Sequence, residues 1–401
     1  MWSVAVLVAV GCGNSAPGSG GAAVDARAGS GDGGYGSADD LATDTGCAGV
    51  FNPDQLLDYH LALSEADWAA LTSDATNSVY FAADLACGDG GSIRVGVRRK
   101  RSGGTEKVGL KVDINQQVAG QSYFGLKKLS LENGVSEGDT DASARDLLSE
   151  YLAWRMMQRS QLMASRVALA RVFVNGRLLG VYVNVEQVDR RFLRHRIGDD
   201  NGWLFKYSGS ASDGQKTNEG IANPYGAYFC FLERTGCAAP SADQLAAELP
   251  GKLDIDQLLR MGAVNAAIAN TDSPLLKFNN YLYYDWAGGP RIYLPWDLDT
   301  AMNSSYDVFT GSVPGGTTVF TDVLFTHWED DYDAILTALL AMPLTPDAIE
   351  GETDRAVAVA GGALDADPNI TGGAADAGSA LATWWRARHA EVTASVEAHA
   401  P

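Results

Sequence analysis

Two aspartates that follow an apolar stretch are the residues of this sequence best suited to chemistry. The stretch Arg291–Pro295 has the pattern of a strand, and it leads through Trp296 to Asp297 and Asp299. Carboxylates fixed at a strand end supply the oxygen ligands that Mg²⁺ or Ca²⁺ requires. The alternative is an ordinary strand-to-turn junction, where Asp is common because it hydrogen-bonds the local backbone. The rest of the chain has to decide between a metal site and a turn.

The composition describes an acidic globular protein. The chain has 401 residues, is 46% hydrophobic and carries a net charge of -20. This length is sufficient for two lobes, around separate or shared cores. A surface this acidic repels nucleic-acid backbones and anionic lipid headgroups. An anionic ligand must therefore be held by a local group of Lys and Arg residues or by a metal.

The first residues have the pattern of an export signal. Residues 1–11 form a short apolar run that ends before Cys12, which is typical of a bacterial lipoprotein signal segment. The run is shorter than the roughly 20 apolar residues that span a bilayer. Residues 13–46 are almost all Gly, Ala, Ser and Asp and predict a flexible tether. We expect a secreted protein or a cell-envelope lipoprotein, touching the membrane only through a lipid on Cys12.

Four further cysteines bear on the compartment. They lack the paired CxxC spacing of zinc sites. In an oxidising compartment, Cys230 and Cys237 would close a small loop and leave Cys47 to pair with Cys87. The alternative is four free thiols in a cytosolic protein.

The N-terminal half has the pattern of an antiparallel sheet with one inserted helix. A short helix is expected to begin after Ser64, which is a suitable cap, and Asn175–Gly176 is a strong hairpin signal. The inserted helix is expected over 141–158, with Asp141 or Ser143 as its cap. The strands are expected over 59–63, 92–98, 107–114, 124–131, 167–174 and 178–185. We expect this β-rich lobe to span 47–190.

The second half is expected to be a mainly helical lobe over 191–401. A helix over 255–269 ends before a loop with Asp272, and a strand over 279–284 then precedes the strand that leads to Asp297. One helix exit and one hairpin separate the two aspartates, so both can face one cleft. In the first half, the basic turn Arg98–Thr105 is either a solvated turn or an edge that handles phosphate.

This order of parts is that of protein-kinase-like phosphotransferases. Phosphoryl transfer needs a cation over the leaving phosphates, a carboxylate at the attacking hydroxyl and a lysine that orients the nucleotide. The usual kinase strings HRD, DFG and GxGxxG are absent from the sequence.

At several strings the sequence resembles the CotH kinase family, which is named for a spore coat protein. The resemblance implies an α+β, protein-kinase-like fold of two lobes that transfers the γ-phosphate of ATP to Ser or Thr hydroxyls of a protein, with Mg²⁺ or Mn²⁺. The strings that carry it are Val95–Arg98, Lys127–Asn133, Val174–Gly176, Gly180–Tyr182, Trp203–Lys206, Asn279–Tyr283 and Pro295–Asp299. Arg99–Ser102 departs from the family, whose turn often has a glycine there.

The resemblance assigns roles in catalysis and metal binding. It implies that Asp297 binds the metal and that Asp272 is the catalytic-loop aspartate. The second metal ligand is Asn279 or Asn280. Asp299 is either a further ligand or a capping residue, which is the commoner role of Asp after a strand.

The resemblance also assigns residues to the nucleotide. Either Lys107 or Lys111 would orient the phosphates, and periodicity cannot choose between them because residues four apart in a strand share a face. Glu150 would pair with that lysine, unless it is a solvated helix carboxylate. Glu186 falls where the linker between the lobes is expected, near the nucleotide base.

These residues support a main hypothesis and two alternatives. The main hypothesis is an exported, CotH-like atypical protein kinase that acts on an unidentified protein substrate. The first alternative is a non-catalytic cell-surface binding or adhesion protein on a kinase-like scaffold. The second is an enzyme that keeps the nucleotide and transfers another part of it, such as AMP, because fold analogy does not fix chemistry.

Overall fold

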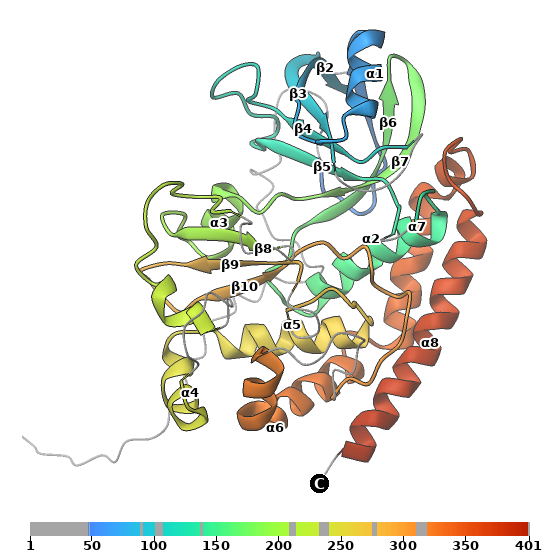
Figure 1. The fold of residues 1–401 in the computed structure, drawn as a ribbon. Helices are drawn as coiled ribbons and strands as arrows, with labels where there is room; N and C mark the ends of the chain where they lie inside the picture. Colours follow the sequence, from blue (N-terminus) through green and yellow to red (C-terminus); the bar gives the residue numbers. More distant parts are fainter. Residues whose placement is uncertain are drawn as a thin grey trace, which may run out of the picture. The chain divides into compact units, whose positions relative to one another are not determined.

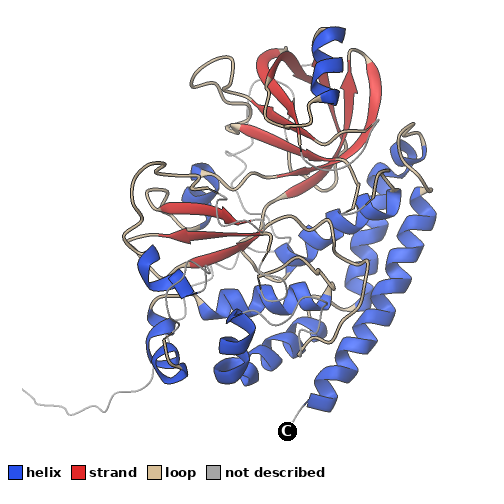
Figure 2. Ribbon diagram, in the orientation of Figure 1, coloured by secondary structure: helices blue, strands red, loops and turns tan. Residues whose placement is uncertain are grey.

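The computed structural model of the chain shows a mixed α+β protein (Figures 1 and 2). It describes residues 47, 49–88, 91–100, 107–136, 139–207, 214–231, 240–274, 279–309 and 319–399. The predicted signal segment with Cys12, the tether, Cys237 and residues 101–106 of the basic turn lie outside these ranges. Among the described helices, none is both long and apolar enough to cross a membrane.

Seven strands of the first half close into a barrel, in the order β1-β2-β3-β4-β5-β7-β6. The neighbours are antiparallel, except that β1 and β6 are parallel and close the barrel. The Asn175–Gly176 turn joins β6 to β7 with positive φ angles of 51° and 78°, as a two-residue hairpin needs. The strands are β1 (Leu57–Ala62), β2 (Phe81–Cys87), β3 (Ile93–Arg99), β4 (Leu110–Asp113), β5 (Lys128–Glu132), β6 (Val167–Val174) and β7 (Arg177–Val185).

The barrel corrects the predicted antiparallel sheet in one respect. The first strand returns to pair in parallel with β6, a long-range contact that alternation within one segment cannot reveal. The short helix expected after Ser64 is α1 (Glu65–Ser73), and the Ser64 side chain caps it by accepting from the Asp67 amide. The predicted disulfide joins Cys47 to Cys87 at the end of β2. Cys230 is also disulfide-bonded.

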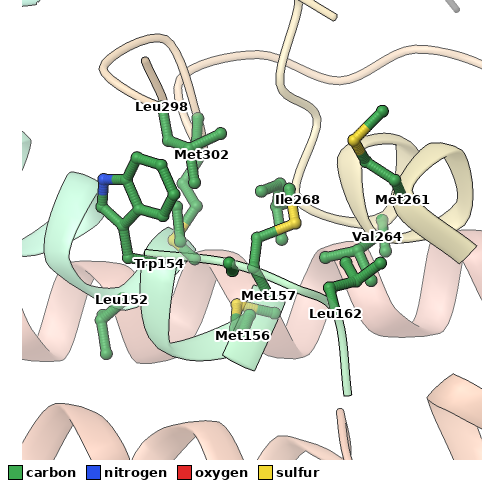
Figure 3. Packing of buried hydrophobic residues seen from close by; sticks show 14 of the residues in the cluster. Leu152, Trp154, Met156, Met157, Leu162, Met261, Val264, Ile268, Leu298 and Met302 are labelled. Atoms are coloured by element: carbon green, nitrogen blue, oxygen red, sulfur yellow. The ribbon is translucent and has the colours of Figure 1, made fainter. Parts of the chain in front are cut away.

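Helix α2 (Ala144–Arg159) is the inserted helix, and Ser143 caps it. It is buried on almost every side because it packs between the barrel strands β6 and β7 and the helices α5 (Ile255–Ala267), α7 (Pro346–Asp365) and α8 (Ala374–His399). Figure 3 shows its Trp154 and Met157 beside Leu298, Met302 and Ile268. The core therefore connects α2 to the segment that follows Asp297 and to the end of α5.

The remaining strands form a three-stranded antiparallel sheet, in the order β10-β9-β8. Its strands are β8 (Trp203–Tyr207), β9 (Tyr281–Asp285) and β10 (Ile292–Pro295). Helix α3 (Arg190–Arg196) shares a small apolar cluster with this sheet, including Phe192 and Leu204. The other helical segments are the 3₁₀ helices η2 (Gly226–Phe231) and η3 (Leu249–Gly251), α4 (Ala242–Glu248) and α6 (Val319–Ala341).

Candidate functional site

Asp272 lies in the loop that follows α5 and is 4% exposed. Its Oδ2 accepts hydrogen bonds from Asn279 Nδ2 at 3.1 Å and from Asn280 Nδ2 at 3.3 Å. Its backbone amide donates to Asn270 Oδ1 at 3.3 Å. The structure thus brings the predicted catalytic carboxylate together with both candidate metal-binding asparagines.

Asp297 directly follows Trp296 at the end of β10 and has a φ of 56°. This left-handed conformation is uncommon for a residue with a Cβ and is tolerated best by Asn and Asp among such residues. The loop is tied to the Asp272 loop because Thr300 Oγ1 donates to Asn270 Oδ1 at 2.5 Å. Asn270 therefore links the two aspartate-bearing loops.

Lys100, which the sequence analysis did not single out, faces the same cluster. It follows β3, where its backbone amide donates to the Gly109 carbonyl at 2.8 Å. Its Nζ donates to Ser130 Oγ at 3.0 Å and to the Glu132 carboxylate, and its side chain is 19% exposed. Lys100 belongs to the basic turn that was predicted either to handle phosphate or to be solvated, so the sequence did contain a signal for it.

The charge of Lys100 interacts with those of the predicted site residues Asp297 and Glu150. Burial lowers the pKa of Lys100 to about 8, against the opposing effects of the Asp297 and Glu150 carboxylates. Burial and, second, the Asp297 carboxylate raise the pKa of Glu150 to about 8, while Lys100 acts in the opposite direction. Glu150 is 4% exposed on α2, so it is not a solvated helix carboxylate. Lys100, Glu150 and Asp297 form one electrostatic cluster.

The two lysines that were predicted to orient the nucleotide have different environments. Lys107 donates to Asp367 Oδ2 at 2.7 Å, and the two side chains are 2% and 0% exposed. Lys107 thus pairs with Asp367 in the core and does not pair with Glu150. Lys111 instead donates to Gln187 Oε1 at 2.6 Å. Burial and neighbouring cations, Lys100 first among them, hold the pKa of Lys111 well below its usual value.

Glu186 follows β7 at the position that was expected for the linker. Its carboxylate accepts from Arg166 Nη2 at 2.6 Å and from Arg196 Nη2 at 3.0 Å. It is 4% exposed and lies against these two guanidinium groups, so it anchors the linker to α3. The next residues, Gln187–Asp189, line a cleft.

The cleft has a volume of about 1100 Å³ and is strongly basic. Its walls come from the barrel, from the Gln187–Asp189 linker with α3, and from the three-stranded sheet. Leu282 on β9 and Trp296, which follows β10, supply apolar surface. Lys206 on β8 lies over the Trp296 ring at 4.6 Å. The basic residues that line the cleft are Arg98, Lys111, Lys127, Lys128, Arg190, Arg191, Arg194, Lys206 and Lys216.

The donor set at the aspartates suits a magnesium ion held mainly by a bound phosphate. Within the described residues there is no group of three or more His, Cys, Asp or Glu side chains that could hold a metal. Mg²⁺ commonly binds through only one or two protein carboxylates plus substrate phosphates and water. Asn279 Oδ1 is buried in the described structure without a hydrogen-bond partner. An acceptor oxygen in that state fits a cation.

The comparison with protein families identifies the chain. The model of the CotH kinase protein family matches residues 100–394, so the chain belongs to the CotH kinase family. The matched range begins at Lys100 and contains both aspartate loops.

Two further comparisons add no functional assignment. The comparison with curated proteins gives no match. A solved structure from Shewanella oneidensis MR-1, the toxin–antitoxin complex of HipA, HipB and operator DNA, contains a chain with 13% identity and a TM-score of 0.32. The similarity covers 68% of this chain and 60% of that chain, less than two thirds of its length. A likeness this low supports no conclusion about activity.

Proposed function

We propose that this protein is an atypical protein kinase that transfers the γ-phosphate of Mg-ATP to Ser or Thr hydroxyls of a protein. The observation that carries the proposal is geometric: Asn279 and Asn280 hold the Asp272 carboxylate, and Asn270 links the Asp272 loop to the Asp297 loop. The charges of Lys100 and the buried Glu150 both interact with that of Asp297. With Asp272, these are the lysine, helix carboxylate, metal carboxylate and catalytic carboxylate that phosphoryl transfer employs. In the proposal, the barrel with α2 and the part from α3 onward act as the two lobes of a kinase-like fold.

In this proposal, Lys100 takes the role that was predicted for Lys107 or Lys111. Its Nζ is held by Ser130 and Glu132 and lies within the influence of Glu150 and Asp297. A lysine in this setting can orient α- and β-phosphates by charge and hydrogen bonding. Lys111 and Lys206 lie in the cleft itself and would neutralise further phosphate charge.

Asp272 would act on the substrate hydroxyl. The hydroxyl oxygen forms a bond to the γ-phosphorus as the bond between that phosphorus and the β–γ bridging oxygen breaks, and ADP leaves. The hydroxyl proton goes to Asp272, whose carboxylate Asn279 and Asn280 hold in place. Asp297 and Asn279 would hold the magnesium ion, which neutralises charge on the phosphate oxygens when bound.

The apolar and aromatic surface of the cleft suits the nucleotide base. Leu282 supplies aliphatic surface and Trp296 supplies aromatic surface, and residues Gln187–Asp189 of the linker line the same cleft. Glu186 supports this wall through its two arginines and would not itself touch the base.

The test is incubation of the full chain with Mg²⁺ or Mn²⁺ and ATP labelled at the γ- or the α-phosphate, followed by mass spectrometry of modified residues. The proposal expects γ-label on Ser or Thr and no α-label. Asp272→Asn should reduce labelling at least about 100-fold while nucleotide-dependent thermal stabilisation remains. Transfer of α-label would indicate AMP transfer instead. Absence of both nucleotide binding and labelling would favour the surface-binding protein.

We also infer export to the bacterial envelope, with Cys12 as the lipid site. The inference is supported by the Cys47–Cys87 disulfide, since disulfides persist in oxidising compartments. Metabolic labelling with a fatty-acid analogue should mark the wild-type chain and not Cys12→Ser. Equal labelling of both chains would contradict the anchor.

A further inference from the structure

The basic cleft is large, and many more cations than carboxylates line it. Pockets for small molecules commonly have volumes of about 300–1,000 Å³, and this cleft has a volume of about 1100 Å³. Nine of its lining residues are Lys or Arg, and three are Asp or Glu, in a chain whose net charge is -20. Basic residues are thus concentrated here against the trend of the whole sequence.

Two lysines of the cleft donate hydrogen bonds to uncharged acceptors. Lys111 donates to the Gln187 side-chain oxygen at 2.6 Å, and Lys127 donates to the Gly120 and Gln121 carbonyls at 2.9 and 2.8 Å. Each side chain is therefore fixed in position, and neither is bonded to a carboxylate in the described structure.

The same holds for two arginines of the cleft. Arg98 Nη1 donates to the Asn77 carbonyl at 2.6 Å. Arg190 donates to the Asp200 carbonyl and, at 2.7 Å, to Asn218 Oδ1. By contrast, Lys128 and Arg194 contact the carboxylates of Asp113 and Asp200. Positioned cations without carboxylate partners are the condition for binding an external anion.

The cations come from two different parts of the cleft. Lys111 is paired in register with Arg98 and with Ser130, the residue that also holds Lys100, so this group lies on the sheet face that serves the proposed phosphate site. Lys127 immediately precedes β5, and Arg190 begins α3 after the linker. Lys127 therefore lies at the start of β5 and Arg190 at the start of α3, and neither belongs to the group around Lys100. We call the part of the cleft that these two residues line its margin.

We propose that this margin, formed by Lys127 and Arg190, binds acidic side chains that flank the acceptor residue, so that the substrate is an acidic polypeptide segment. The inference rests on the proposed kinase function and names its substrate class. Charge complementarity favours an acidic peptide over a basic one. The net charge of -20 opposes a nucleic acid, whose continuous phosphate backbone would extend beyond the cleft onto an acidic surface.

Binding is tested separately from catalysis by fluorescence anisotropy. The probes are three labelled peptides with one central serine, flanked by three Asp, three Ala or three Lys residues on each side, and a labelled single-stranded oligothymidine. All are titrated with the whole chain at saturating Mg²⁺ and ADP. We expect the Asp peptide to bind at least about tenfold more tightly than the Ala peptide, with affinity falling as salt is raised.

Variants then locate the binding. Lys127→Gln and Arg190→Gln should each weaken binding of the Asp peptide roughly fivefold, as expected for one partly exposed ion pair. The matched control is Arg177→Gln, an arginine on the β6–β7 hairpin that pairs with exposed Glu65. It should leave peptide affinity unchanged. Equal or tighter binding of the Lys peptide or the oligothymidine, or insensitivity to both variants, would overturn the inference.

Transfer is then measured with the same peptides and γ-labelled ATP. The two cleft variants should raise the KM for the Asp peptide and change kcat and the KM for ATP by less than about twofold. If the Asp peptide binds in the expected way but receives no phosphate, the kinase proposal fails while acidic-peptide binding stands. If transfer occurs equally to all peptides, the kinase proposal stands and the acidic substrate class fails.

Discussion

At the scale of single residues, the site depends on conformations and charges that carry a cost. Asp297 has a positive φ. For residues other than glycine, this left-handed backbone conformation costs of order 1–3 kcal/mol. Lys100 and Glu150 are largely buried, and burial moves their pKa values toward the neutral forms. Natural proteins are only marginally stable, and they keep unfavourable conformations and buried charges mainly at functional sites. The unfavourable features of these residues therefore indicate a functional site.

Asp297 offers a test that separates charge from backbone strain. Asp297→Asn keeps a side chain that tolerates the left-handed conformation and removes the carboxylate, so activity should fall at least about 100-fold with stability nearly unchanged. Asp297→Ala should lose the same activity and in addition about 1 kcal/mol of unfolding free energy. Initial rates and urea denaturation measure the two effects. Full activity of the Asn variant would exclude a metal-binding role.

Lys100 and Lys107 provide a contrasting pair. Lys100→Met should raise the KM for ATP or lower kcat by about 10- to 100-fold, because an interaction with the phosphates is lost. Lys107→Met should instead leave Asp367, which is 0% exposed, buried without its cation and cost about 3–5 kcal/mol of stability.

Kinetics and urea denaturation on both variants decide the assignment. A folded Lys107→Met chain with the larger kinetic defect would return the nucleotide role to Lys107. Lys100→Arg is the conservative control and should recover part of the lost rate.

At the scale of elements, the sequence predicted most of the segments and left their pairing open. Hydrophobic periodicity and capping residues located α2 and α5, and Asn175–Gly176 located the β6–β7 hairpin. Periodicity could not show that Lys107 meets Asp367, because that partner is 260 residues away in the sequence. It also could not show that Lys100 reaches Ser130 on β5, since this contact depends on the register of three strands. The aspartates were found because their spacing and neighbouring strings are local.

The link between the two aspartate loops is the element-scale feature most open to test. Asn270 is 1% exposed, and its Oδ1 accepts from both Asp272 N and Thr300 Oγ1. Asn270→Ala should cost about 1–3 kcal/mol of stability and lower kcat about tenfold, because the two loops lose their common anchor.

The control is Asn369→Ala, which removes a hydrogen bond to the Leu179 carbonyl at 2.9 Å. It should reduce stability by a similar amount and leave kcat unchanged. Equal kinetic effects of the two alanines would show that Asn270 acts only through stability.

At the scale of the whole molecule, charge and burial are distributed unevenly. The chain carries a net charge of -20, yet nine Lys and Arg residues line one cleft, so the electrostatic field favours the approach of anions at that cleft. The core is rich in buried tyrosines, several of which carry raised pKa values because burial disfavours the charged phenolate. These tyrosines predict how stability responds to alkaline pH.

Burial raises the pKa of Tyr151 on α2 to about 12, whereas an unfolded tyrosine titrates near 10. Between these values the folded chain keeps a proton that the unfolded chain has lost, so stability is fully present below pH about 10 and falls as pH rises toward 12. The loss should approach about 1.4 kcal/mol per pH unit for each such tyrosine. Tyr151→Phe is the matched control, because the Tyr151 hydroxyl is buried without a hydrogen-bond partner in the described structure. Urea denaturation at pH 8 and pH 11 should give a smaller decrease for the Phe variant, and an equal decrease in both chains would contradict the assignment.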